Sequence, residues 1–129
     1  PCTAGTETDP MSTPSPDHFR VLHPMDHHQI LDNREAPSLV IYGQDRCGAC
    51  RHVCNLLSSD DWLSLRFPGL IVFSVDISLG TWLSKELDIF HLPELLLYEH
   101  GEITARIHCQ LNKEALEESI ATVLTTEQK

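Results

Sequence analysis

The 129-residue sequence has few basic residues and no long hydrophobic run. Nine Lys and Arg against nineteen Asp and Glu give a formal net charge of −10, which disfavours nucleic acid and anionic membrane surfaces as partners. No apolar run approaches the roughly 18 residues that a membrane-spanning helix requires, and no basic-then-apolar signal pattern opens the chain. We therefore expect a soluble protein that binds neither nucleic acid nor membranes.

The cysteines do not suit a secreted scaffold held together by disulfides. The five cysteines are an odd number, and only Cys47 and Cys50 form a close pair that a helical pattern follows. This usage indicates a reducing compartment, so we expect a cytoplasmic protein. Because the sequence starts at Pro1, Met11 is a candidate natural start, with residues 1–10 left over from expression or from a processed leader.

The remaining composition is that of a single globular domain. An apolar fraction of 41% over 129 residues is enough for one core. Residues 1–17 are rich in Thr, Ser, Pro and acidic residues, so we expect a disordered tail in which Cys2 has no role. One folded domain over residues 18–127, without internal repeats, is expected to follow.

Hydrophobic patterning predicts alternating strands and helices in the order β-α-β-α-β-α-β-β-α. Such alternation implies parallel strands joined by right-handed crossovers, with a final antiparallel hairpin added to the same sheet. The expected strands cover residues 19–23, 38–43, 70–76, 94–98 and 103–108. The expected helices cover residues 27–34, a segment from about residue 47, one or two turns near 62–67, then 81–88 and about 113–124.

The first helix has a predicted cap and a predicted inner face. Asp26 is expected to cap the helix over residues 27–34, with Ile30 and Leu31 directed inward. The histidines of this region, His27 among them, are assigned to an exposed polar face. We therefore expect a short amphipathic helix with an apolar inner side and a polar outer side.

One stretch of the chain carries the chemistry. Cys47-Gly48-Ala49-Cys50 follows a predicted buried strand and opens a helical pattern. The first thiol then lies among the unpaired N–H groups of the helix, where the amides and the helix dipole favour a thiolate. Arg46 and Arg51 flank the pair and add positive charge. Cys50, about one turn further along, is placed to attack a mixed disulfide at Cys47, so the pair can cycle between dithiol and disulfide.

The same pair is also compatible with a metal-binding knuckle or with inert thiols. His52 and Cys54 extend the motif to Cys-x-x-Cys-x-His-x-Cys, but on a helix His52 points away from the face of Cys50 and Cys54, and no second ligand cluster follows. An iron–sulfur or zinc site shared across a dimer remains an alternative. Cys54 is expected to pack as a small buried hydrophobe, with a redox role as the alternative. We expect redox chemistry with no metal and no cofactor bound by this chain.

Three segments together resemble the thioredoxin family. They are Cys47-Gly48-Ala49-Cys50 after the central strand, Val75-Asp76 closing the next strand, and Leu92-Pro93 leading into residues 95–102. The resemblance covers roughly residues 19–124. It implies an α/β fold of the thioredoxin-like kind, a three-layer α/β/α sandwich around a central mixed sheet.

The resemblance also implies roles for individual residues. Cys47 would be the attacking thiolate and Cys50 the resolving thiol. Pro93 would be a cis proline beside them, a bond that is cheap only before proline, and an extended substrate segment would pair with the outward backbone of Leu92. The implied substrate-binding residues are Arg46, Gly48, Ala49, Leu92 and Pro93.

Several family positions hold different residues here. Arg46 and Ala49 replace the tryptophan before the first cysteine and the proline before the second. Ile41 and Val72 stand where the family usually has a buried aspartate and a nearby lysine, so proton transfer would need a water or a histidine instead. Glu94 replaces a common threonine, and a carboxylate there tends to raise the pKa of a nearby thiol.

Two further residues are auxiliary candidates. His91, close to Pro93 in sequence, is a candidate proton carrier near neutral pH, with a surface loop residue as the alternative. Cys109 falls, by the family pattern, in the loop that borders the active-site surface, where it either reaches Cys47 or is a bystander.

These observations together predict a function in cell redox homeostasis and electron transport. We expect a monomeric thiol–disulfide oxidoreductase that acts on protein disulfides or dithiols and takes its electrons from an external reductase or a thiol pool. The alternative is a non-catalytic thioredoxin-fold binding or chaperone-like module.

Overall fold

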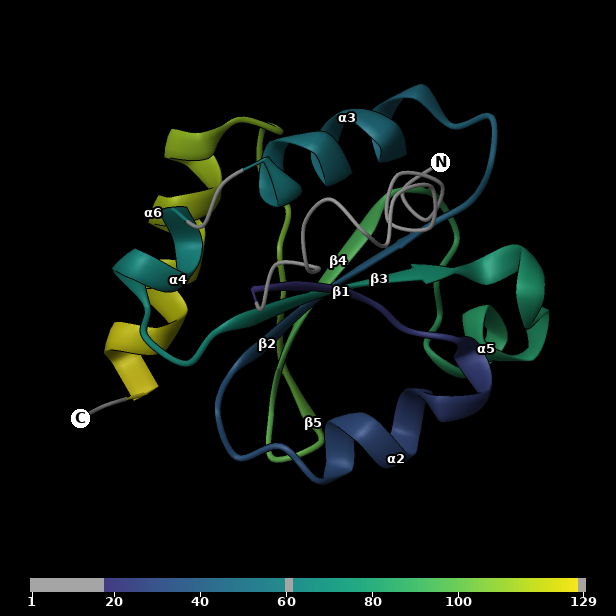
Figure 1. The fold of residues 1–129 in the computed structure, drawn as a ribbon, viewed down its shortest axis with the longest axis horizontal. Coiled ribbons are helices and arrows are strands. Elements are labelled where there is room, and N and C mark those ends of the chain that lie inside the picture. The colour runs from purple at the N-terminus through teal and green to yellow at the C-terminus, as the bar shows by residue number, and fades with distance from the viewer. Residues whose placement is uncertain (1–17, 60–61, 128–129) are drawn as a thin grey trace, which may run out of the picture.

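The computed structural model describes residues 18–59 and 62–127. The predicted tail over residues 1–17 lies outside these ranges. A mixed five-stranded sheet in the order β1-β3-β2-β4-β5 forms the middle layer, with α3, α4 and α6 on one face and α2 and α5 on the other (Figure 1). The predicted order of elements and the three-layer sandwich are confirmed.

The bounds of the elements follow the hydrophobic pattern closely. The strands are β1 (Phe19–Val21), β2 (Ser38–Gly43), β3 (Ile71–Asp76), β4 (Glu94–Glu99) and β5 (Glu102–Arg106). The helices are α2 (His27–Asp32), α3 (Gly48–Ser58), α4 (Trp62–Arg66), α5 (Thr81–Glu86) and α6 (Lys113–Glu127), and the 3₁₀ turns are η1 (Pro24–Asp26) and η2 (Ile77–Leu79). Within the described residues, no helix combines the length and the hydrophobicity needed to cross a membrane.

The central strand β2 pairs with two neighbours of opposite direction. It runs parallel to β3 and antiparallel to β4, and all six of its residues are buried. Both faces of β2 are covered by helices, which explains its continuous run of apolar residues. The strand ends at the edge of the sheet where α3 begins (Figure 1).

Strand alternation divides the core into two apolar clusters. Leu95 and Leu97 of β4 pack in one cluster with side chains of α3, α4 and α6. Leu96 and Tyr98, the residues between and after them, pack in the other with side chains of α2 and α5. Because successive side chains of a strand point to opposite faces, one strand supplies both clusters.

The first helix differs from its prediction in three respects. The side chain of Asp26 makes no capping hydrogen bond to α2, and the helix ends at Asp32. Ile30 is 39% exposed, whereas His27, predicted on the surface, is completely buried. The inner face of α2 is formed by His27 and Leu31, four residues apart, so Ile30 lies beside this face and not on it.

Candidate active site

Cys47 and Cys50 form a disulfide at the start of α3, with their Cα atoms 5.2 Å apart. Cys47 is the N-cap residue of the helix, and its Sγ accepts a hydrogen bond from the backbone N–H of Cys50 at 3.1 Å. Cys47 is half-buried, Cys50 is only 2% exposed, and Gly48 and Ala49 between them are exposed. The predicted placement of the first sulfur at a helix N-terminus is confirmed, and the two sulfurs differ in accessibility.

The sheet below fixes the position of this disulfide. A Cβ atom at Gly43 would lie 2.9 Å from the Sγ of Cys50, so only glycine at the end of β2 allows α3 to approach this closely. In the antiparallel ladder between β2 and β4, Tyr42 pairs with Glu94. Tyr42 directly precedes Gly43 and Glu94 directly follows Pro93, so Gly43 and Pro93 lie at the same end of this ladder. The disulfide and the segment that carries Pro93 are therefore at the same end of the paired strands.

The Leu92–Pro93 peptide bond is cis, as predicted. Leu92 and Pro93 are half-buried, and Leu92 packs against the α2 and α5 cluster. Within the described residues, the N–H groups of residues 90–92 form no hydrogen bond to another backbone group. This stretch of backbone thus retains donors for an extended segment that binds alongside it.

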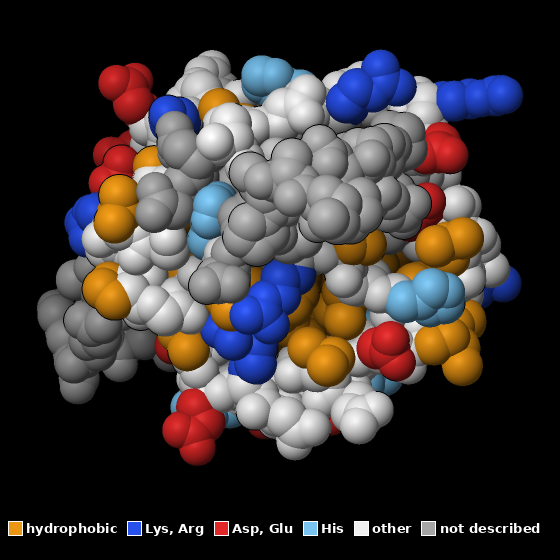
Figure 2. All heavy atoms as spheres, viewed as in Figure 1, with side chains coloured by type: hydrophobic (Ala, Val, Ile, Leu, Met, Phe, Trp, Pro, Cys, Tyr) orange, Lys and Arg blue, Asp and Glu red, His pale blue; other side chains and the backbone are white. Residues whose placement is uncertain are grey.

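Positive charge surrounds the start of α3. Arg46 and Arg51 are both exposed, and basic side chains gather over this end of the helix, at the upper right of Figure 2. Arg46 has a φ of 67°, in the left-handed region that non-glycine residues seldom adopt. The flanking positive charge expected from the sequence is present beside Cys47.

Comparison with known proteins agrees with this arrangement. A family model for thioredoxin matches residues 18–122. The chain belongs to the thioredoxin family. A thioredoxin from Nicotiana alata is similar in structure, with a TM-score of 0.67 and 17% identity, over 87% of this chain and 97% of that one. A mutant thioredoxin from Halobacterium salinarum has a TM-score of 0.67 and 19% identity, over 86% and 95% of the two chains. No curated protein sequence matches significantly.

This thioredoxin-family chain has an apolar layer beneath the active-site helix. Ile41, in the place of the usual aspartate, is buried in one cluster with Val53 and Cys54. The Sγ of Cys54 lies 3.8 Å from the Oγ of Ser74. Cys54 is therefore buried, as predicted, and Ile41 supplies no carboxylate for proton transfer.

His52 and Cys109 have contacts near α6 and in the cluster under α3. His52 is exposed, and its Nε2 lies 2.9 Å from the carbonyl oxygen of Leu111, so it connects α3 to the loop before α6. Cys109 is a half-buried free thiol that packs against the cluster under α3. Within residues 18–59 and 62–127, no group of three or more His, Cys, Asp or Glu side chains has the geometry of a metal site.

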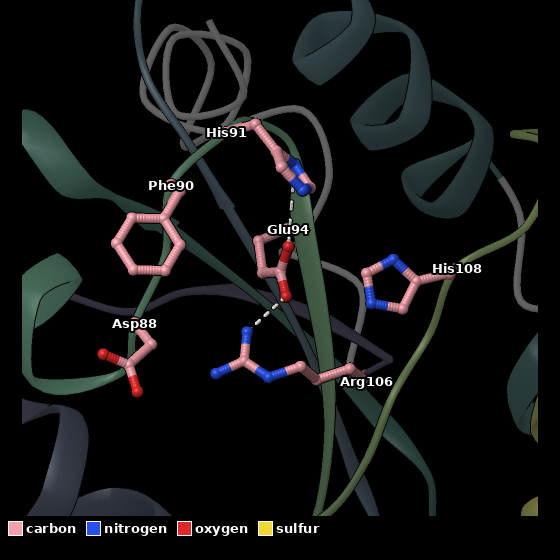
Figure 3. A pocket seen from close by; sticks show the side chains of 6 residues that line it. All are labelled: Asp88, Phe90, His91, Glu94, Arg106 and His108. Atoms are coloured by element: carbon pink, nitrogen blue, oxygen red, sulfur yellow. Dashed lines mark hydrogen bonds and ion pairs between the residues drawn. The ribbon is translucent and has the colours of Figure 1, made fainter.

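The sequence suggested that the carboxylate of Glu94 would act on a nearby thiol. In the structure this carboxylate is paired with an arginine. The Glu94 side chain is 5% exposed, and its Oε2 lies 2.5 Å from the Nη1 of Arg106 on β5. Figure 3 shows both side chains in a depression below His91, whose Nδ1 lies 3.8 Å from the Oε1 of Glu94. The guanidinium compensates the carboxylate, so Glu94 opposes the arginines beside Cys47 less than expected.

Sequence reasoning missed a buried polar chain in the other cluster. The Nε2 of His27 lies 2.7 Å from the Oη of Tyr42, which lies 2.8 Å from the Oη of Tyr98. On its other side, His27 contacts His28 through their Nδ1 atoms at 3.0 Å, and the Nε2 of His28 lies 2.8 Å from Glu86. The spacing of His27 and Leu31 on one helix face was the available signal.

Burial is the main cause of the shifted pKa values of His27, Tyr42 and Tyr98. Burial, with a smaller contribution from the neighbouring His28, lowers the pKa of His27 to about 4. Burial raises the pKa of Tyr98 to about 12 and that of Tyr42 well above its ordinary value, where the neighbouring Tyr98 adds to the effect. All three groups are therefore neutral near pH 7.

Proposed function

We propose that this protein is a thiol–disulfide oxidoreductase that exchanges disulfides with protein clients through Cys47 and Cys50. The observation that carries the proposal is the disulfide at the N-terminus of α3, beside the cis Leu92–Pro93 bond. A sulfur at a helix N-terminus and a strip of backbone at residues 90–92, whose N–H groups bond to no other described backbone group, lie at the same end of the paired strands. A client segment bound along this strip would bring its own sulfurs to Cys47.

In the reductive direction, the cycle begins with the dithiol form. The thiolate of Cys47 attacks one sulfur of the client disulfide, the client S–S bond breaks, and the other client sulfur leaves as a thiolate. Cys47 is then joined to the client in a mixed disulfide. The N–H of Cys50 that bonds to the Sγ of Cys47, together with the helix dipole, favours the anion that starts this step.

The second step returns the chain to the form seen in the structure. The thiol of Cys50 loses its proton and attacks the Sγ of Cys47, which releases the second client sulfur and forms the Cys47–Cys50 disulfide. Two electrons have then passed to the client. An external reductase or a thiol pool would restore the dithiol, and the same steps in reverse would oxidise a client dithiol.

Shielding of Cys50 favours this division of roles. Its sulfur is packed above Gly43 and is almost completely buried, whereas Cys47 is half-buried and accessible. A bulky client disulfide therefore meets Cys47 first. The proton of the Cys50 thiol has no carboxylate at Ile41 to accept it, so we expect resolution to be the slower step.

A non-catalytic binding module is the rival function. It would use the same backbone strip at Leu92 to hold a client without exchanging electrons. The N–H groups of residues 90–92, which bond to no other backbone group among the described residues, suit that function equally well. The reactivity of Cys47 distinguishes the two.

A trapping experiment with Cys50→Ser tests the proposal. Without the resolving thiol, the mixed disulfide at Cys47 cannot be released by the second step, so we expect covalent adducts with protein disulfides that disappear on adding dithiothreitol. The adducts are measured by non-reducing gel electrophoresis and mass spectrometry. The matched control is the double variant Cys47→Ser with Cys50→Ser, which should form none.

Turnover provides the second measurement. We expect the wild type to reduce insulin disulfides with dithiothreitol as electron source, Cys47→Ser to lose about 10³-fold or more, and Cys109→Ser to stay within about twofold. Client binding without adducts or turnover would favour the binding module. Loss of activity in Cys109→Ser would show that the Cys109 thiol takes part.

A further inference from the structure

The segment between α5 and β4 borders a cavity. Residues 88–93 leave α5, pass over the edge of the sheet and enter β4 at Glu94. A cavity of about 340 Å³ lies against this segment (Figure 3). Its lining residues are Asp88, Phe90, His91, Glu94, Arg106 and His108.

One arginine holds both ends of this segment. The Nη1 of Arg106 donates a hydrogen bond to the Oε2 of Glu94 at 2.5 Å, and its Nη2 donates to the carbonyl oxygen of Leu87. Leu87 immediately precedes the segment and Glu94 immediately follows it. A planar guanidinium can donate to two acceptors at once in a fixed geometry, which a lysine does less well.

The middle of the segment has few other attachments. The N–H of Ile89 donates to the carbonyl oxygen of Ser84 at 2.9 Å, and the side chain of Ile89 is buried. Beyond Ile89, residues 90–92 make no backbone–backbone hydrogen bond within the described residues, and Phe90 and His91 are exposed. Apart from the packing of the Leu92 side chain against the α2 and α5 cluster, the position of residues 90–92 therefore depends on how the ends of the segment are held.

The burial of Glu94 makes the arginine contact hard to replace. A carboxylate that is 5% exposed needs a charged or hydrogen-bonding partner, because an unpaired buried charge is strongly unfavourable. Without Arg106, Glu94 would turn outward to water. Since Glu94 follows Pro93 directly, that movement would displace the backbone at Leu92.

We propose that Arg106 is a positioning residue for client binding, which it serves by holding Leu87 and Glu94 so that the Leu92 backbone stands ready beside Cys47. The inference rests on the proposed disulfide-exchange function. Arg106 touches neither sulfur in this arrangement, so it acts through the segment it holds. Its removal should weaken the binding of protein clients and leave the chemistry of the sulfurs unchanged.

The test compares two substrates in Arg106→Gln. Insulin needs a docked backbone segment, whereas bis(2-hydroxyethyl) disulfide is small, uncharged and has no peptide backbone. We expect KM for insulin to rise about tenfold with kcat within about twofold, and the rate with the small disulfide to stay within about twofold. Arg106→Lys should give an intermediate KM, because it retains the charge but not the fork geometry.

A matched control comes from an exposed ion pair of the same chemistry elsewhere. Arg66 of α4 pairs with Glu117 of α6 at 3.0 Å, with both side chains largely exposed. Arg66→Gln should leave KM and kcat for insulin and the rate with the small disulfide at their wild-type values. NMR order parameters of residues 90–92 should fall in Arg106→Gln and stay at wild-type values in Arg66→Gln.

The possible results separate the two proposals. If the wild type turns over neither substrate, the disulfide-exchange function fails, and the positioning role fails with it. If the wild type is active and Arg106→Gln keeps the wild-type KM for insulin, or loses activity equally with both substrates, the positioning role alone is overturned. If Arg106→Gln does not fold, the single variants Arg106→Lys and Glu94→Gln replace it. A wild-type KM for insulin in both of them would overturn the positioning role.

Discussion

The two faces of the sheet carry opposite kinds of chemistry. On the face of α3, α4 and α6, the core under the disulfide is apolar, and Ile41 stands in the place of the family's usual acid. On the face of α2 and α5, the core contains the chain of His27, Tyr42 and Tyr98, and Glu94 is bonded to Arg106 near its edge. Ile41 and Tyr42 are neighbours in sequence yet belong to different faces.

This difference separates the Cys47–Cys50 disulfide from the buried titratable groups. Cys50 rests on the apolar face, so no described carboxylate or imidazole beneath it takes the place of the absent proton acceptor. The polar groups are on the far side of β2. No described residue on the α3 face replaces the aspartate and lysine that the family usually has there. The polar groups of the α2 and α5 face have a separate role, in stability.

When His28 is neutral, one assignment of donors and acceptors satisfies all the hydrogen bonds that link Glu86, His28, His27, Tyr42 and Tyr98. The Nε2–H of His28 donates to Glu86, so its Nδ1 accepts from the Nδ1–H of His27. The Nε2 of His27 then accepts from the hydroxyl of Tyr42, whose oxygen accepts from the hydroxyl of Tyr98. Every buried group in the chain is satisfied in this arrangement, which explains how the core tolerates them.

The largest expected loss of stability comes from removing a buried leucine, and the loss should be similar on the two faces of the sheet. Leu96 and Leu97 are adjacent in β4 and completely buried, one in each cluster. Leu96→Ala and Leu97→Ala should each lower the free energy of unfolding by about 2–5 kcal/mol, because each leaves a cavity. Urea denaturation measures both. A loss below about 1 kcal/mol for either variant would show that its face is loosely packed and would break the comparison.

The next effect should distinguish the faces by pH. Unfolded His27 takes up a proton near its ordinary pKa of 6.5, whereas the folded protein does so only near 4. Its contribution to stability is therefore complete above pH 6.5 and is lost as pH falls toward 4, by at most about 3 kcal/mol.

Replacement of His27 isolates this contribution. His27→Gln should destabilise the protein more at pH 7.5 than at pH 4.5, since the wild type loses the His27 term at the lower pH. Denaturant titrations at both values measure the difference, with the exposed His108→Gln as the control. An equal destabilisation at the two values would mean that His27 does not titrate as its burial requires.

The smallest effect should rank the two tyrosines. Tyr42→Phe removes the hydroxyl that bonds to His27 and leaves a buried ring nitrogen without its partner, so we expect a loss of about 1–3 kcal/mol. Tyr98→Phe leaves the bond between Tyr42 and His27 in place, and about 0.5–1.5 kcal/mol is expected. Thermal denaturation at pH 7.5 compares them. The reverse ranking would show that the chain is held mainly from the Tyr98 end.

Much of this protein was readable from local pattern. The apolar run of β2 and the placement of Cys47 at a helix start follow from short segments, whereas the cis Leu92–Pro93 bond followed from the resemblance to the thioredoxin family. Asn112 also caps α6 as a sequence of this kind favours, with its Oδ1 accepting the N–H of Ala115 at 2.8 Å. Hydrophobic periodicity and helix-start signals act within one element, so one sequence is enough to read them.

Only the tertiary structure decided what the polar side chains do. The sequence predicts an exposed His27 and reveals no partner for Glu94, because it does not contain the distance from His27 to Tyr42 or from Glu94 to Arg106, residues that are 15 and 12 positions apart. A polar group enters a core when a partner from another element satisfies it. That partner is set by the register of the sheet and the placement of α2, which exist only once the chain has folded.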